Sequence, residues 1–164
     1  MLHGAGRLQH ARTVLEAALP IAPQDYELNF VLGNTLSALG DIANAERHYR
    51  AAVAAQPDSA IAHNNLGYML RLLGDIDGAI VCLNEAIVRA PSLTLAHCNL
   101  ADLYLSLDRP VETEQAARRA VALDTGSSTA YFLLARALAD QNALTEATRL
   151  FAEGHSQSLR KVLV

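Results

Sequence analysis

The chain repeats itself at a shift of 34 residues without insertions, and this regularity restricts its fold more than any other feature. One set of matched positions holds Leu-Gly or Leu-Ala pairs, two sets are mostly alanine, and one is mostly proline. The last set has glycine in its first three positions and aspartate and asparagine in the next two. The sets are Leu32-Gly33, Leu66-Gly67, Leu100-Ala101 and Leu134-Ala135; Ala11, Ala45, Ala79, Thr113 and Ala147; Ala18, Ala52, Ala86, Ala120 and Gly154; Pro23, Pro57, Pro91 and Thr125; and Gly6, Gly40, Gly74, Asp108 and Asn142. Five sets in one register indicate a repeated structural unit.

Each unit is predicted to be a hairpin of two helices. Apolar residues at helical spacing, such as Ile42, Ala45 and Tyr49, lie between the glycine and proline positions, and a second such run lies after the proline. The small residues let paired helix axes approach to roughly 8–10 Å. The expected helices are near 8–20, 25–39, 42–55, 59–73, 76–89, 93–107, 110–123, 127–141 and 144–158.

Helix boundaries are marked by residues with known capping behaviour. Asp41 and Asp75 follow the glycine positions and are expected to cap the next helix. After the prolines, Asp58 or Ser59 and then Ser92 are expected to do the same. Pro110 suits the first turn of a helix, where its missing N–H costs nothing.

Composition excludes several functions. The chain has 51% hydrophobic and 18% charged residues and a net charge of −4, so it offers no basic field for nucleic acid. No apolar run approaches the roughly 18 residues of a membrane span. Cys82 and Cys98 form no CxxC pair and are expected to be reduced thiols, so the sequence predicts a cytoplasmic location.

The segment from Asn29 to Pro57 resembles the tetratricopeptide repeat (TPR), with Leu32, Gly33, Leu36, Ala45, Tyr49, Ala52 and Pro57 in register. The segment from His63 to Pro91 is nearly as similar. The resemblance implies an all-α fold, a right-handed superhelical α-solenoid of TPR hairpins, in a bacterial-type TPR protein or a TPR domain of a larger one. One domain over 1–164 would contain a half repeat (1–24), four full repeats (25–59, 60–93, 94–127 and 128–158) and a C-terminal tail (159–164).

The resemblance also predicts a peptide-binding groove lined by the first helix of each hairpin. The inward-facing positions are Phe30, Asn34, Asn64, Asn65, Tyr68, Arg71, Cys98, Asn99, Asp102, Leu105, Phe132, Arg136 and Asp140. Asn65 and Asn99 share one offset and would hold a peptide backbone through their side-chain amides, unless they bond within their own hairpins. Arg71 and Arg136 would bind carboxylates of a partner. Nearby acidic residues give the groove both positive and negative charges, however, and both arginines are also compatible with a solvated surface.

No chemistry of catalysis stands out. His63, His97 and Cys98 suggest a metal site, but neither an HxxxH motif nor a carboxylate at ligand spacing accompanies the two histidines, and packing in an aromatic position explains both of them. The chain has no GxGxxG, no GxxxxGK[ST] and no HExxH motif. The sequence therefore predicts no enzyme activity, no metal and no cofactor.

The leading hypothesis is a module that binds a peptide or protein segment in its groove. Two alternatives stay open. The chain begins with the second helix of a unit and ends without a polar capping helix, which suits the substrate-recruiting arm of a larger glycosyltransferase or sulfotransferase. The same ends also suit a self-assembling scaffold, a homo-oligomer whose uncapped terminal helices stack.

The helix near 110–123 is predicted to be the least tightly packed of the second helices, because Thr113 and Ala117 stand where better-fitting or larger residues occur in the other repeats. Hydrogen exchange followed by mass spectrometry should show its amides exchanging faster than those of 42–55 and 76–89. Finding 110–123 the best protected of these helices would contradict the prediction.

Overall fold

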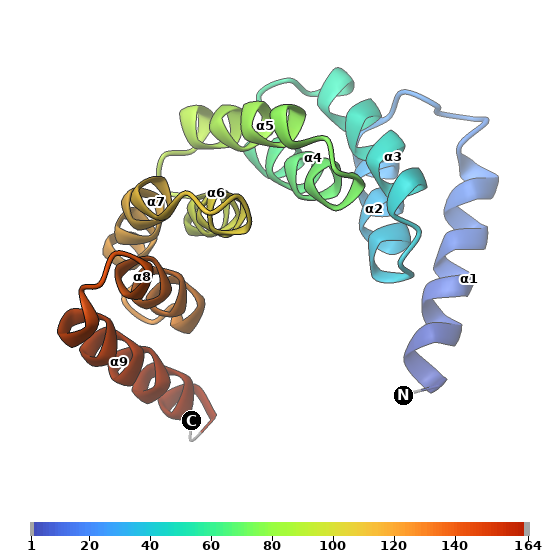
Figure 1. The fold of residues 1–164 in the computed structure, drawn as a ribbon. Coiled ribbons are helices and arrows are strands. Elements are labelled where there is room, and N and C mark those ends of the chain that lie inside the picture. Colours follow the sequence, from blue (N-terminus) through green and yellow to red (C-terminus); the bar gives the residue numbers. More distant parts are fainter. Residues whose placement is uncertain (1, 163–164) are drawn as a thin grey trace. The chain divides into compact units, whose positions relative to one another are not determined.

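The computed structural model describes the backbone of residues 2–162 and the side chains of residues 6–157. Within this part of the chain there are nine α-helices and no β-strand (Figure 1). The helices are α1 (Leu2–Ala18), α2 (Tyr26–Ala38), α3 (Ile42–Ala55), α4 (Ala60–Leu73), α5 (Ile76–Arg89), α6 (Thr94–Ser106), α7 (Pro110–Leu123), α8 (Ser128–Asp140) and α9 (Leu144–Val162). The predicted all-α repeat fold is confirmed.

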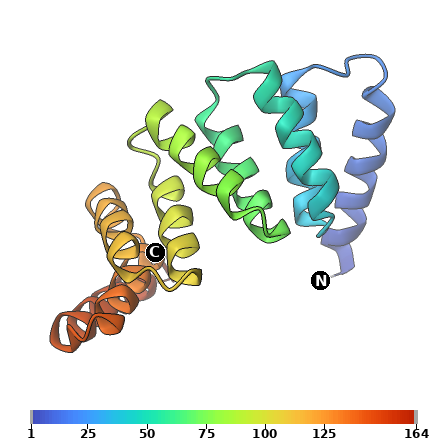
Figure 2. The same ribbon diagram turned by 45° about the horizontal axis from the view of Figure 1, so that its top comes forward.

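The helices pair into hairpins within two compact units. Unit 1 (Met1–Arg89) contains α1 and the hairpins α2–α3 and α4–α5, and unit 2 (Ala90–Val164) contains the hairpins α6–α7 and α8–α9 (Figure 2). Two ends differ from expectation. The first helix begins at Leu2 rather than near residue 8, so Gly6 lies inside it, and α9 continues through Val162 into the segment predicted as a tail, whose last residues, 163–164, lie outside the described range.

The glycine positions close the turn inside each hairpin. Gly40, Gly74, Asp108 and Asn142 have φ angles of 78°, 83°, 55° and 63°, the left-handed region that glycine, aspartate and asparagine tolerate best. The amide that follows each of them donates to a carbonyl five residues earlier, at 2.9, 2.9, 3.1 and 2.8 Å. The recurring residue therefore ends the first helix and reverses the chain.

The helices approach closely where the sequence places small residues. Ala45, Ala79 and Ala120 are completely buried, as expected. At Gly33 the ring of Tyr49 lies so near that an added Cβ would be 2.9 Å from its Cδ1 atom. The small residue on the first helix thus makes room for the large residue on the second.

The predicted caps are confirmed in part. Ser59 Oγ accepts from the amide of Ala62 at 3.2 Å, Asp75 Oδ1 accepts from the amide of Gly78 at 3.0 Å, and Pro110 opens α7. The prediction for Asp41 is wrong, because its carboxylate accepts from the side chain of Asn44 instead.

The prediction that Ser92 caps α6 is also wrong. The cap position recurs every 34 residues as Asp25, Ser59, Leu93 and Ser127. Ser92 stands one residue too early, and Leu93 has no side-chain acceptor to offer.

A buried polar pair joins α2 to α3. Asn29 Nδ2 donates to the carbonyls of Pro23 and Asp25 at 2.9 and 2.8 Å, which leaves Asn29 Oδ1 to accept from His48 Nδ1–H at 3.0 Å. His48 Nε2 lies 3.4 Å from a guanidinium nitrogen of Arg47. Burial and, next, the charge of Arg47 lower the pKa of His48, against a smaller opposing effect of Glu16. His48 is therefore held neutral.

In the part of the chain that the structure describes, no helix is both long and apolar enough to cross a membrane.

Gly33→Ala should lower the free energy of unfolding by about 1–3 kcal/mol, because the new methyl group displaces the ring of Tyr49. In a Tyr49→Ala background the same substitution should be neutral or stabilise by up to about 1 kcal/mol, because alanine favours helix over glycine. Urea unfolding of the wild type and the three variants, followed by circular dichroism, measures both effects. An equal cost in the two backgrounds would refute the steric explanation.

Stability should fall as the pH drops below about 6.5, the ordinary pKa of histidine. The folded pKa of His48 is lowered, so the unfolded chain takes up the proton first and is favoured by acid. His48→Asn keeps a donor toward Asn29 Oδ1 but does not titrate. Urea midpoints measured between pH 7.5 and pH 5.5 should depend less on pH in this variant, and an unchanged dependence would count against a role for His48.

Candidate binding surface

The predicted groove residues fall into both units, and each unit presents its own set. Unit 1 contains Asn34 on α2 and Asn64, Asn65, Tyr68 and Arg71 on α4. Unit 2 contains Asn99 and Asp102 on α6 and Arg136 on α8.

Unit 1 brings several of these residues together through side-chain hydrogen bonds. Asn34 Oδ1 accepts from the Tyr49 hydroxyl at 2.7 Å and from Asn65 Nδ2 at 3.2 Å. Asn65 Oδ1 in turn accepts from Asn64 Nδ2 at 3.1 Å. The bond between Asn34 and Asn65 joins two consecutive hairpins, α2–α3 and α4–α5, so these asparagines do not bond only within their own hairpins.

This amide network determines which way Asn34 faces. Both bonds to Asn34 use its oxygen, so its Nδ2 group points elsewhere and has no acceptor among the described residues. Asn34 is exposed, whereas the Tyr49 that anchors it is buried, and burial raises the pKa of the Tyr49 hydroxyl and keeps it protonated as a donor. The surface thus presents an oriented amide donor to solvent.

Two predicted groove residues of unit 1 serve packing rather than contact. Asn64 is 1% exposed, which removes it from the side chains that a ligand can touch and leaves it to orient Asn65. Phe30 stacks on Tyr26 at 5.5 Å and meets the edge of Tyr49 at 6.0 Å between ring centroids. Asn64 is therefore buried behind Asn65, and Phe30 is half-buried in contact with the two tyrosines.

Exposed apolar side chains flank the amides, and the sequence reasoning missed most of them. On α4, Ile61, Tyr68 and Leu72 are 54%, 38% and 45% exposed, and on α2 Val31 is 41% exposed. Ile61, Asn65, Tyr68 and Leu72 lie at intervals of four, three and four residues, so they form one stripe along α4. That spacing was the signal that would have found them. We call Val31, Asn34, Ile61, Asn65, Tyr68 and Leu72 the α2/α4 face.

Arg71 borders this face. Its guanidinium carbon lies 5.6 Å from the centroid of the Tyr68 ring, within the range of a cation–π contact. The arginine is half-buried and has an interaction of its own within the protein, so its charge contributes to holding Tyr68 in place.

The predicted groove residues of unit 2 are more strongly polar than those of unit 1, and they already interact with other residues of the protein. Asn99 and Asp102 are half-buried and each takes part in an interaction within the protein. Arg136 Nε donates to both carboxylate oxygens of Asp140 at 3.2 Å, one turn further along α8. Acidic and basic groups therefore alternate here, as the sequence indicated.

The two histidines considered as metal ligands bind backbone carbonyls instead. His63 Nε2 donates to the Pro57 carbonyl at 3.0 Å, and His97 Nε2 donates to the Pro91 carbonyl at 3.1 Å. Asn29 makes the equivalent bond to Pro23. Among the described residues no group of three or more His, Cys, Asp or Glu side chains is arranged to hold a metal ion.

The two cysteines are not activated. Both are free, and burial raises the pKa of each thiol above its ordinary value. Neither thiol is poised to act as a nucleophile at neutral pH.

Comparison with known proteins agrees with this architecture. The family model of the tetratricopeptide repeat matches residues 30–94. A comparison with curated proteins gives no significant match.

Three solved structures are similar over most of the chain. The crystal structure of MamA has a TM-score of 0.88 at 21% identity and covers 99% of this chain and 95% of MamA. A thermophilic TPR protein of Thermus thermophilus has a TM-score of 0.75 at 25% identity, covering 98% and 88% of the two chains. YrrB, described as a TPR protein with an unusual peptide-binding site, has a TM-score of 0.73 at 21% identity, covering 87% and 74%. Residues 30–94 therefore match the tetratricopeptide repeat family, and the chain as a whole shares the all-α hairpin fold of these structures.

Proposed function

We propose that the chain is a protein-interaction module and that the α2/α4 face of unit 1 binds an extended segment of a partner protein. The observation that carries the proposal is the oriented amide of Asn34, which is exposed, held through its oxygen and left with a free donor group. The repeat fold supports it, and so does the similarity to YrrB, a TPR protein with a peptide-binding site.

The chemistry of the face favours an extended peptide over a helix. An extended backbone has carbonyl and amide groups that need partners, whereas a helix satisfies its own. Asn34 Nδ2 can donate to a peptide carbonyl. Asn65 donates one Nδ2 hydrogen to Asn34 and has a second one that can donate to another peptide carbonyl. The two amides thus recognise main chain, independent of the partner's side chains.

The apolar side chains supply most of the binding free energy. Val31, Ile61, Tyr68 and Leu72 expose between 38% and 54% of their surface, and covering them removes apolar area from water at roughly 25 cal/mol per Å². They lie on both sides of the amides along α2 and α4. The preferred partner segment therefore carries apolar side chains before and after the residues whose backbone the amides hold.

We assign no reaction to this surface. Its residues are amides, a tyrosine and aliphatic side chains, without a nucleophile and base in contact with each other. The proposal is a binding role in the cytoplasm.

Asn34→Asp tests the amide donor directly. An aspartate at this position keeps an oxygen that accepts from Tyr49 and Asn65 but replaces the donor group by a second acceptor. Peptides selected from a random linear library on the full chain should bind this variant about tenfold more weakly or worse, because a hydrogen bond of about 0.5–1.5 kcal/mol is lost and a repulsive acceptor is added. Fluorescence anisotropy measures the Kd.

The matched control is Asn84→Asp, which makes the same change of charge at an exposed asparagine of α5 and should leave the Kd unaltered. Replacing single peptide amides of a selected ligand by esters weakens their carbonyl acceptors and should weaken binding at one or two positions only. Equal affinity for the wild type and Asn34→Asp, or no peptide enriched in the selection, would rule out the proposed surface.

A further inference from the structure

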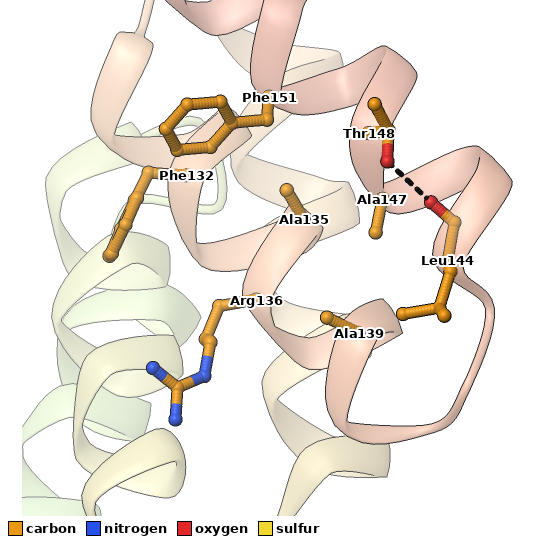
Figure 3. A pocket seen from close by; sticks show the side chains of 8 residues that line it. All are labelled: Phe132, Ala135, Arg136, Ala139, Leu144, Ala147, Thr148 and Phe151. Carbon is orange, nitrogen blue, oxygen red and sulfur yellow. Dashed lines mark hydrogen bonds between the residues drawn. The ribbon is translucent and has the colours of Figure 1, made fainter.

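A second surface lies at the outer side of the last hairpin. Six side chains of α8 and α9 form it, and we call it the α8/α9 end face: Phe132, Ala135, Ala139, Leu144, Ala147 and Phe151. They surround a cavity of about 310 Å³, with Arg136 and Thr148 at its edge (Figure 3). Phe132, Leu144 and Phe151 are 50%, 63% and 57% exposed, although Leu133, Leu134 and Leu150 of the same two helices are buried.

The exposure of Phe151 is an exception within its repeat position. Its equivalents one, two and three repeats earlier are Ala117, Leu83 and Tyr49, and they are 0%, 0% and 2% exposed. Tyr49 lies over Gly33, where an added Cβ would meet its ring at 2.9 Å. The residue that corresponds to Gly33 in the last hairpin is Ala135, whose methyl group occupies that space.

The ring of Phe151 therefore lies beside Phe132 instead, at 6.4 Å between ring centroids. The two rings form one wall of the cavity, and the small side chains of Ala135, Ala139 and Ala147 line it (Figure 3). The space above these alanines lies between the aromatic pair and Leu144.

The preceding hairpin of unit 2 shows what covers such a face. The residues 34 positions earlier, among them Cys98, Ala101 and Ala117, are buried in one apolar cluster with residues of α8. The stripe of α8 that is directed toward α6 and α7 consists of Ala130, Leu133, Leu134 and Ala137 and ends in Gln141, whose side chain donates to Glu114 Oε2 on α7 at 2.8 Å.

We propose that the α8/α9 end face binds an amphipathic α-helix of a partner protein, which lies on α8 and α9 as α8 lies on α6 and α7. The helix would present alanine and leucine at the spacing i, i+3, i+4, i+7. Its interface continues the repeat packing that the chain already uses.

The polar groups at the cavity favour a helix over an extended strand. Thr148 Oγ1 donates to the Leu144 carbonyl at 2.8 Å, and Arg136 is paired with Asp140. These bonds leave little for an extended backbone to bind, whereas a helix needs no hydrogen bonds from the surface. In this respect the α8/α9 end face is the opposite of the α2/α4 face, with its free amide donor.

The test uses the chain's own α8 as a probe. A fluorescein-labelled peptide with the sequence of residues 127–142, acetylated and amidated, carries the stripe that packs on α6 and α7. Titrating the full-length chain into it should give saturable binding by anisotropy, and a peptide with Leu133→Asp should not bind. Phe151→Ala removes a wall of the cavity, and Ala139→Phe fills the cavity. Each substitution should weaken binding at least about tenfold.

Two controls separate this surface from others. Val111→Ala changes a residue of α7 that is 53% exposed and should leave binding intact, and Asn34→Asp should do the same, because it alters only the α2/α4 face. Three results would overturn the proposal. The first is loss of probe binding with Asn34→Asp, and the second is probe binding that neither Phe151→Ala nor Ala139→Phe weakens. The third is no binding at millimolar concentration. Light scattering of the chain alone should give a monomer; a dimer that Phe151→Ala dissociates would show that a second copy occupies the face and would also overturn it.

Discussion

The structure depends on the close approach of two helices at a small residue that recurs every 34 positions. Gly33 illustrates the constraint, since the ring of Tyr49 lies where a side chain at residue 33 would begin. A close approach at this point allows the second helix to bury its large residue, and the left-handed residue at Gly40 then directs the chain back. Each hairpin satisfies these conditions with different residues, so the spacing is kept while the surfaces vary.

Polar groups inside the repeats have structural uses that their residue types alone do not reveal. Asn29, His63 and His97 occupy a position where the family prefers an aromatic residue, and each donates to a proline carbonyl in the linker before its helix. A carbonyl of that kind, if buried without a donor, would destabilise the fold. The histidines therefore belong to the architecture, which explains their recurrence without a metal.

The two proposed surfaces differ in what they offer a partner. The α2/α4 face combines apolar side chains with an amide whose donor is free, and this combination matches a backbone that still needs hydrogen bonds. The α8/α9 end face is apolar and its polar neighbours are already bonded, so it matches a helix whose backbone is satisfied. One repeated hairpin yields both because the exposed residues differ from unit to unit, and because in the last hairpin Ala135 and Phe151 replace the glycine and tyrosine that pack together at Gly33 and Tyr49.

The sequence by itself determined the repeat, the helical hairpins and their approximate ends, because small residues, prolines and left-handed turn residues act locally or between neighbouring helices. It also indicated Asn34 and Asn65 as surface amides. Only the tertiary structure decided that Asn64 is buried, that Asn34 is held through its oxygen, and that Phe151 lies beside Phe132 rather than over Ala135. These outcomes depend on which side chains meet across helices and on how much space each leaves for the other. The 34-residue spacing of the sequence contains no such information.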